Sequence, residues 1–172
     1  FNPPTAKTLF WVGGSGNFND PKHWSLSSGG NPSFTIPNQN TDVVFDNNGG
    51  IEYVVNLIGN NSIHSIIFIN NRRIYFTGDQ NSELRISGNF QLNNATRFDA
   101  QTRLIFSSSA SSSNNVYTAF NELNCDFYFE KGNWNVSQLM TKKSVNVSTA
   151  KFSLVDGYLK CNDFITTGSS DL

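Results

Sequence analysis

The sequence predicts an all-β protein, and more narrowly a β-solenoid whose short strands stack coil upon coil. Three observations favour this fold. The chain holds 25 asparagines among 172 residues, and asparagine suits tight turns because it tolerates left-handed backbone angles. No window shows a sustained apolar period of about 3.6 residues, so helices are not expected. Two short motifs recur along the chain, as they do in repeat folds. A β-sandwich is the alternative, and it needs no recurring motif.

The composition excludes several classes of function. Only 15% of the residues are charged and the net charge is -1, so the chain has no basic field to attract nucleic acid or an anionic membrane. No apolar run approaches the roughly 20 residues that cross a bilayer. We therefore expect neither a nucleic-acid partner nor direct membrane insertion.

The first 50 residues are expected to form an N-terminal cap. Trp11, Phe18 and Trp24 lie close together in a glycine-rich stretch, and Phe45 ends a short apolar strand at residues 41–46. Aromatic side chains bury roughly 150–250 Å² each, so these four are expected to seal the first coil as a structural plug. The alternative use of the same rings is a platform on which carbohydrate stacks.

From residue 51 onward the chain reads as short β-favouring runs separated by Asn, Gly, Ser and Asp. Many runs alternate apolar with polar residues, which predicts strands with one buried face. Residues 51–172 are therefore expected to form about six coils, stacked at about 4.8 Å and continuing beyond the given sequence. The predicted strands are 51–55, 63–69, 73–77, 83–86, 89–92, 96–98, 103–106, 116–117, 126–129, 133–136, 144–147, 151–154, 158–160 and 164–166.

Two recurring motifs predict the coil length. Residues 88–92 (GNFQL) recur as 132–136 (GNWNV), and residues 125–127 (CDF) recur as 161–164 (CNDF). These separations indicate pairs of coils of roughly 18 to 24 residues each, because every strand of a solenoid pairs with its counterpart in the next coil. The serine-rich run 107–115 cannot bury apolar surface, so we expect a loop that extends from one coil.

Carboxylates provide two further hypotheses. Asp20, Asp42 and Asp46 lie near turns of the cap and are the candidate calcium ligands, although no cofactor is otherwise expected. Asp79 and Asp99 are separated by about one coil, so they are candidates for the paired acids of a polysaccharide-cleaving site. Thirteen scattered acidic residues can produce such a pair by coincidence.

The histidines and cysteines give no recognisable catalytic or zinc motif. His23 and His64 are far apart, and His64 lies inside the apolar run 63–69, so neither is expected to act in catalysis. Cys125 and Cys161 have no partners at metal-binding spacing. They are interpreted as two buried free thiols, with a disulfide between neighbouring coils as the alternative.

Five arginines cluster in the middle third of the chain. We expect them to point outward from strands, where they solvate the surface and hinder edge pairing. The alternative is a mild basic stripe on one face. These residues are Arg72, Arg73, Arg85, Arg97 and Arg103.

The opening unit resembles a known family. Residues 10–25 read FWVGGSGNFNDPKHWS, and a Gly-rich gap and Pro37 precede DVVFD at residues 42–46. This pattern closely resembles the start of large type 9-secreted, gliding-motility-associated and adhesin-like surface proteins of Bacteroidota. Residues 121–170 also look like that family's coils. The chain departs from the pattern at Phe18, where the family often has Trp, and at Thr41, where it often has an acidic residue.

The resemblance implies a non-catalytic structural and adhesive segment of a secreted protein on the exterior of the bacterial outer membrane. It implies a surface or polysaccharide as ligand, and the type 9 secretion machinery as a partner of the full-length protein. The alternative function is a carbohydrate-binding or polysaccharide-cleaving β-helix. That alternative predicts exposed aromatic rings, or two nearby carboxylates, on one face of the stack.

Overall fold

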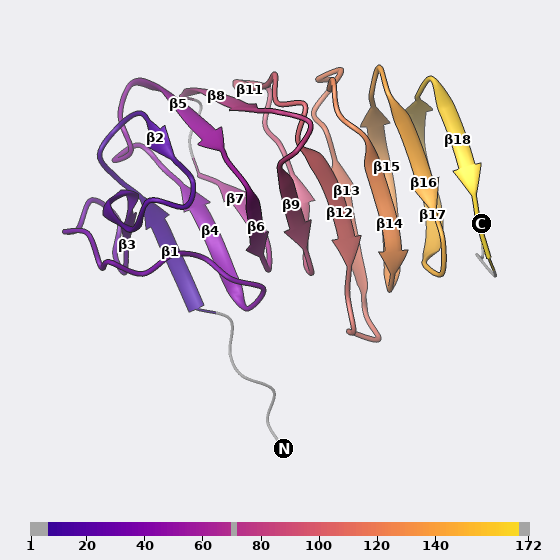
Figure 1. Cartoon of the computed structure of the whole chain (residues 1–172), viewed down its shortest axis with the longest axis horizontal. Coiled ribbons are helices and arrows are strands. Elements are labelled where there is room, and N and C mark those ends of the chain that lie inside the picture. Colours follow the sequence, from indigo (N-terminus) through magenta and orange to yellow (C-terminus); the bar gives the residue numbers. More distant parts are fainter. Residues whose placement is uncertain (1–6, 70–71, 169–172) are drawn as a thin grey trace.

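The computed structural model confirms the β-solenoid (Figure 1). The structure describes residues 7–69 and 72–168. The first six residues of the predicted cap and the last four of the predicted coils therefore lie outside the described residues. Apart from one antiparallel pair and one isolated antiparallel bridge in the cap, the described strands pair in parallel between successive coils. The β-sandwich alternative is therefore wrong.

Three sheets wrap the core. Sheet A, in spatial order, contains β3 (Trp24–Ser25), β1 (Lys7–Trp11), β4 (Thr41–Phe45), β7 (Ile66–Phe68), β10 (Phe90–Gln91), β13 (Ser113–Tyr117), β15 (Asn133–Met140) and β17 (Lys151–Lys160). Sheet B contains β2 (Gly16–Asn17), β5 (Glu52–Leu57), β8 (Arg73–Gly78) and β11 (Thr96–Phe98). Sheet C contains β6 (Asn60–Ile63), β9 (Glu83–Ile86), β12 (Arg103–Ser107), β14 (Phe127–Lys131), β16 (Ser144–Val147) and β18 (Asp163–Thr166).

Successive coils begin at β4, β7, β10, β13, β15 and β17, which gives the predicted number of about six, but the first of these coils begins inside the predicted cap of residues 1–50. The strand register shows how the recurring motifs lie. Phe90 pairs with Val116, which pairs with Val136, so GNFQL and GNWNV lie two coils apart with a shift of two residues. Phe127 pairs with Val145, which pairs with Phe164, so the two Cys-containing motifs also lie two coils apart.

The cross-section changes along the stack. The first three coils are three-sided because each contributes a strand to sheet B, whereas the last strand of that sheet is β11. In the later coils, β15 and β17 continue past the point where the earlier coils turn from sheet A into sheet B. The pairing of β15 with β17 has a register shift between Val136 and Gln138. The predicted strands 151–154 and 158–160 therefore form one long strand, β17 (Lys151–Lys160).

An unbroken series of aromatic contacts runs through the core from the cap to the last coil. Consecutive ring centroids lie 4.6 to 6.1 Å apart in this series. Such pairs add about 0.5–1.5 kcal/mol each beyond their burial, so this series, which we call the aromatic spine, stabilises the contacts between coils. It follows the order Trp11, Trp24, Phe45, Phe76, Phe98, Phe90, Phe106, Phe129, Phe152 and Phe164.

The cap ends the parallel stack at its N-terminal end. The chain leaves β1, makes a short 3-10 turn at Pro21–His23, and returns antiparallel as β3, with Trp11 opposite Trp24. Asp20 accepts a hydrogen bond from the backbone N–H of Lys22 at 2.9 Å and so caps that turn. Reversal of the strand direction places the indole rings over the first coil.

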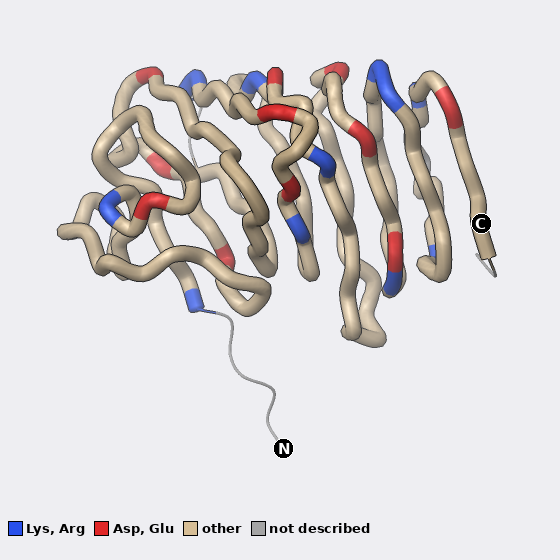
Figure 2. The backbone as a smooth tube through the Cα atoms, viewed as in Figure 1, with Lys and Arg blue, Asp and Glu red and all other residues tan. Residues whose placement is uncertain are grey.

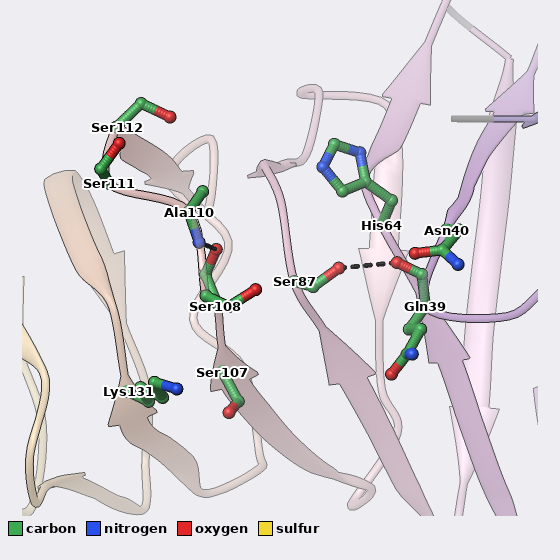
Figure 3. A pocket seen from close by; sticks show the side chains of 11 residues that line it. Gln39, Asn40, His64, Ser87, Ser107, Ser108, Ala110, Ser111, Ser112 and Lys131 are labelled. Carbon is green, nitrogen blue, oxygen red and sulfur yellow. Dashed lines mark hydrogen bonds between the residues drawn. The ribbon is translucent and has the colours of Figure 1, made fainter. Parts of the chain in front are cut away.

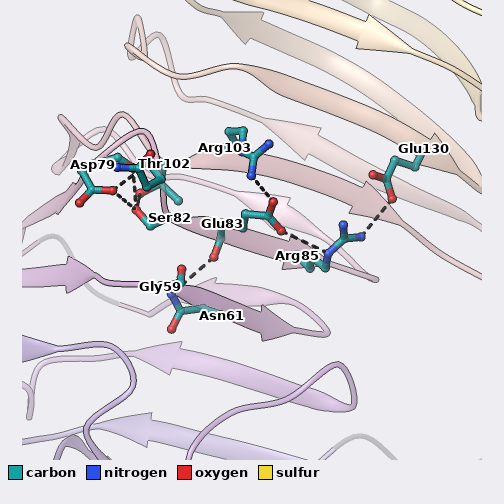
Figure 4. Close-up of polar contacts among 10 residues, drawn as sticks. Gly59, Asn61, Asp79, Ser82, Glu83, Arg85, Thr102, Arg103 and Glu130 are labelled. Carbon is teal, nitrogen blue, oxygen red and sulfur yellow. Dashed lines mark hydrogen bonds and ion pairs between the residues drawn. The ribbon is translucent and has the colours of Figure 1, made fainter.

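Charges on the outer surface are scattered and mixed in sign (Figure 2). On sheet C, Arg103 pairs with Glu83, and Arg85 reaches from the second coil to Glu130 in the fourth at 3.0 Å (Figure 4). These ion pairs cover Ile105, which points outward between them yet is only 4% exposed. The predicted outward arginines are therefore present, but paired with glutamates rather than forming a basic stripe on this sheet.

Candidate functional site

A hollow of about 800 Å³ lies at the corner where sheet C strands end and sheet A strands begin. We call it the corner groove (Figure 3). Its walls come from the loop before β4 and from the loop between β12 and β13, and its floor comes from the two intervening corners. It is lined by Gln39, Asn40, His64, Ser87, Ser107, Ser108, Ser109, Ala110, Ser111, Ser112 and Lys131.

The serine-rich segment forms one wall of the corner groove as an ordered loop. As predicted, it extends outward from one coil between β12 and β13 (Figure 1), but the loop is shorter than the predicted 107–115, because Ser107 ends β12 and residues 113–115 already belong to β13. The buried Ser108 donates its backbone N–H to Lys131 O at 3.0 Å, and Asn133 Nδ2 donates to Ser111 O at 2.9 Å. The neighbouring Gly132 has φ +98°, and a Cβ there would lie 2.9 Å from Ser108 O. Glycine therefore allows the base of this wall to pack closely.

The floor of the corner groove also depends on a glycine. A Cβ on Gly88 would lie 2.4 Å from Ser65 Oγ and 2.8 Å from His64 Cε1. Without that Cβ the backbone passes directly beneath the imidazole. Ser87 donates its hydroxyl to Gln39 O at 2.8 Å, which joins the floor to the wall on the cap side.

His64 is oriented by a carboxylate. Its Nδ1 lies 2.7 Å from Asp42 Oδ1, and the Ser65 hydroxyl lies 3.2 Å from the same nitrogen. Because an ionised carboxylate only accepts hydrogen bonds, Nδ1 carries the proton in the neutral ring, and Nε2 is then an acceptor. The His64 side chain is 41% exposed, so this acceptor is available to a ligand.

A second hollow of about 510 Å³ adjoins the first and shares His64 with it. We call it the sheet A trough, because it follows the outer surface of β7, β10 and β13. Its lining includes the apolar side chain of Ile67, which is 39% exposed, the ring of Tyr117, and the amide of Gln91. The two hollows thus place apolar and hydrogen-bonding groups on either side of one imidazole.

The structure does not bring the candidate calcium ligands together. Asp20 caps the 3-10 turn, Asp42 binds His64, and the buried Asp46 accepts a hydrogen bond from the Asn48 backbone at 2.8 Å. Within residues 7–69 and 72–168, no group of three or more His, Cys, Asp or Glu side chains is placed to hold a metal ion. The three carboxylates therefore do not form one group, and calcium binding by any one of them with backbone oxygens stays a prediction.

The aromatic residues of the cap lie in the core, where a plug would lie. Trp11, Phe18, Trp24 and Phe45 are at most 1% exposed, and Trp24 Nε1 donates to Phe18 O at 2.7 Å. Tyr53 stacks beside Trp11, and burial, followed by the nearby Asp46 carboxylate, raises its pKa. The carbohydrate platform is wrong for these rings because their faces contact other core side chains.

Both cysteines are free thiols, as predicted, but only Cys125 is buried, so the expectation of two buried thiols is wrong for Cys161, which is partly exposed. Cys125 precedes β14 and Cys161 precedes β18, which lie two coils apart in sheet C. The disulfide between neighbouring coils is therefore wrong, because an entire coil separates the two sulfurs. Burial raises the pKa of Cys125 well above its ordinary value, and burial with the nearby Asp163 also raises the pKa of Cys161.

The candidate paired acids lie on adjacent coils but at different register positions. The Asp99 backbone N–H donates to Phe76 O, whereas Asp79 follows Gly78, whose carbonyl accepts from Gln101. Asp79 is used in its own turn, where its carboxylate accepts from the Asn81 backbone at 2.8 Å (Figure 4 shows Asp79 with Ser82 and Thr102). The two carboxylates therefore lie on adjacent coils about two residues out of register, and their use as paired acids stays a prediction.

His64 lies at a corner, where the sequence pattern predicted the interior of a strand. The predicted strand 63–69 is broken at His64 and Ser65, which form a corner between β6 and β7. Buried Ser65 makes this corner by accepting the Asn89 backbone N–H at 2.9 Å. One signal could have revealed the site, because Asp42 and His64 are 22 residues apart, which is one predicted coil.

Comparison of this chain with protein-family models, with curated proteins and with solved structures found no match. Among the described residues there is also no helix with the length and hydropathy of a membrane span.

Proposed function

We propose that this chain is a non-catalytic structural and adhesive segment of a secreted bacterial cell-surface protein, involved in surface attachment or gliding. One observation carries the proposal: a continuous series of aromatic contacts runs through the interior, while the lateral surface presents neutral polar groups in open hollows. A rod of this kind needs no reacting group. It contacts a surface through many weak interactions whose combined avidity is high.

The cellular context in this proposal comes from the resemblance of residues 10–46 and 121–170 to type 9-secreted surface proteins. In that context the full-length protein is exported by the type 9 secretion machinery and lies on the outer membrane exterior. The mixed and sparse surface charge supports contact with uncharged partners over electrostatic binding to nucleic acid (Figure 2).

A surface-retention experiment tests this function. The purified chain is passed over polysaccharide films and bare glass on a quartz-crystal microbalance, and the same polysaccharides are assayed for new reducing ends. We expect retention on at least one surface without release of reducing ends. Absence of retention on every surface would contradict adhesion, and release of reducing ends would show that the chain is an enzyme.

A further inference from the structure

We propose that the corner groove and the sheet A trough together bind one linear, neutral polysaccharide chain that passes over His64. This inference rests on the proposed adhesive function and adds the binding site and the chemical class of the ligand. The two hollows share His64 and have volumes of about 800 and 510 Å³. Together they form one continuous track across several coils.

The chemistry of the corner groove matches sugar hydroxyls. Most of its lining side chains are serine hydroxyls, with the amides of Gln39 and Asn40 and the imidazole of His64. A sugar hydroxyl both donates and accepts hydrogen bonds, and so do serine hydroxyls and side-chain amides. His64 Nε2 provides a fixed acceptor because Asp42 holds the other ring nitrogen at 2.7 Å.

The sheet A trough supplies the apolar contacts that the hydroxyl-rich corner groove lacks. The exposed Ile67 side chain offers apolar surface for the C–H face of a pyranose, the partly buried Tyr117 ring lines the same hollow, and Gln91 lies beside them. Aromatic rings contribute contact area at little entropic cost. A sugar chain that crosses His64 therefore moves from a hydroxyl-rich region to an apolar region without leaving the track.

The width of the groove fits a chain-like ligand. Its walls precede β4 and β13, which are the first strands of the first and fourth coils. Three steps of about 4.8 Å separate these coils, so the walls stand about 14 Å apart. The serine wall is fixed at both ends through Ser108 and Asn133, so the site is largely formed before a ligand arrives.

Two other ligand classes fit the same surface poorly. A peptide cannot extend sheet A here, because β7 and β10 already have hydrogen-bonded neighbours on both sides and β-augmentation requires a free edge. A strongly anionic ligand finds little charge to bind. Lys131 is the single Lys or Arg among the described lining residues of the two hollows, and the Asp42 carboxylate also lines the trough.

Blocking variants test the proposal in the whole chain. Ser109→Trp fills the corner groove and Gln91→Trp fills the trough, and both positions are exposed, so the fold is retained. Thr149→Trp is the control, because Thr149 is exposed at the same kind of corner two coils after the serine wall and lines neither hollow; it also removes the hydrogen bond from the Thr149 hydroxyl to Glu130 O. Circular dichroism and the urea midpoint verify that each variant is folded.

The readout is the dissociation constant for neutral β-glucan, xylan and mannan oligosaccharides of increasing length, with alginate as the anionic comparison. We expect the affinity of the native chain to increase with the length of the oligosaccharide. Either blocking variant should weaken this affinity at least about tenfold, whereas Thr149→Trp should weaken it less than about twofold. A tenfold loss corresponds to about 1.4 kcal/mol.

Each other outcome overturns a specific claim. Loss with only one blocking variant contradicts a single chain spanning both hollows. Binding of alginate alone, abolished by salt, contradicts neutral-sugar recognition. Retention on films or glass that neither blocking variant changes overturns this site but leaves the adhesive function standing. Retention on no surface at all overturns both.

Discussion

The two ends of the solenoid differ sharply in how they present the core. At the N-terminal end, β1 and β3 pair antiparallel and the indoles of Trp11 and Trp24 are fully buried. At the other end of the described stack, β17 and β18 are the outermost strands of their sheets, and Phe164 is 40% exposed. Both ends have outermost strands, but the apolar side chains of the cap are covered, whereas Phe164 in the last described strand is partly exposed.

This difference shows that closure is a separate property from stacking. Parallel coils repeat the same pairing without limit, and each new coil exposes another edge. Only a local change of direction, here the short turn at Pro21–His23 that leads into β3, ends the series. The cap is thus expected to stabilise the stack more than the last coil does.

Removal of an indole ring from the cap is expected to lower the free energy of unfolding more than any other change proposed below. Trp24→Ala deletes a fully buried ring that contacts Trp11, Phe18 and Phe45. It should lower the free energy of unfolding by about 3–5 kcal/mol, measured by urea denaturation. The matched change at the other end, Phe164→Ala, should cost about 1 kcal/mol or less because the ring is partly exposed. Equal losses would refute the asymmetry.

Hydrogen exchange should show the same asymmetry residue by residue. The Val43 amide in β4 donates to Ser65 O inside sheet A, whereas the Thr167 amide follows the edge strand β18. Because local opening is easiest where few neighbours are lost, we expect exchange at least about 100-fold faster around β18, measured by NMR. Similar protection at both positions would mean that the last coil opens only with the whole stack.

Thiol labelling compares an interior position with one near the edge. Cys125 is buried and its pKa is raised well above the ordinary value, whereas Cys161 is only partly buried. We expect a disulfide reagent to modify Cys161 in the folded chain and Cys125 only after unfolding, because the thiolate is the reactive form. Cys161→Ala is the control that isolates Cys125. Rapid labelling in that variant would contradict the buried position.

The smallest effect on the stability of the chain is expected from removal of an ion pair that joins the fourth and sixth coils. Lys160 Nζ lies 2.8 Å from Glu122 Oε1, which lowers the pKa of Glu122 and raises that of Lys160. The contribution of Glu122 to the free energy of unfolding is therefore present above the pKa of this group in the unfolded chain. It is lost as the pH falls through the lowered pKa of the folded chain. The contribution of Lys160 to the free energy of unfolding is present below the pKa of this group in the unfolded chain. It is lost as the pH rises through the raised pKa of the folded chain.

Because both groups are exposed to solvent, Glu122→Gln should change the unfolding midpoint very little at neutral pH. The measurement is a pair of urea titrations of the native chain and the variant at neutral and acidic pH. The small difference between the urea midpoints of the native chain and the variant should become smaller still at acidic pH. A large change at neutral pH would show that this pair, and not apolar packing, holds the edge coils.

The features that could be predicted from sequence are those set by local patterns. The strand 144–147 was predicted with the bounds of β16, because its alternating Ser-Val-Asn-Val pattern specifies one buried face. The burial of the cap aromatics was likewise expected from their size and clustering. In each of these cases, neighbouring residues carry the necessary information.

The corner groove could not be predicted in the same way. It joins Gln39, His64, Ser87 and Lys131, which are brought together only by the register of several coils. The apolar pattern of residues 63–69 also continues across the corner at His64, because the residues on both sides are buried in different sheets. Periodicity cannot detect a turn that leaves the apolar pattern unchanged.

The adhesive function is tested most directly by comparing one copy of the chain with two copies joined by a flexible linker. Retention of both forms on polysaccharide films would be measured on the quartz-crystal microbalance. A lateral binding surface on a stiff rod predicts weak retention of the single copy and at least about 100-fold stronger retention of the linked pair. Failure of both forms to remain on any film or on glass would contradict the proposed function.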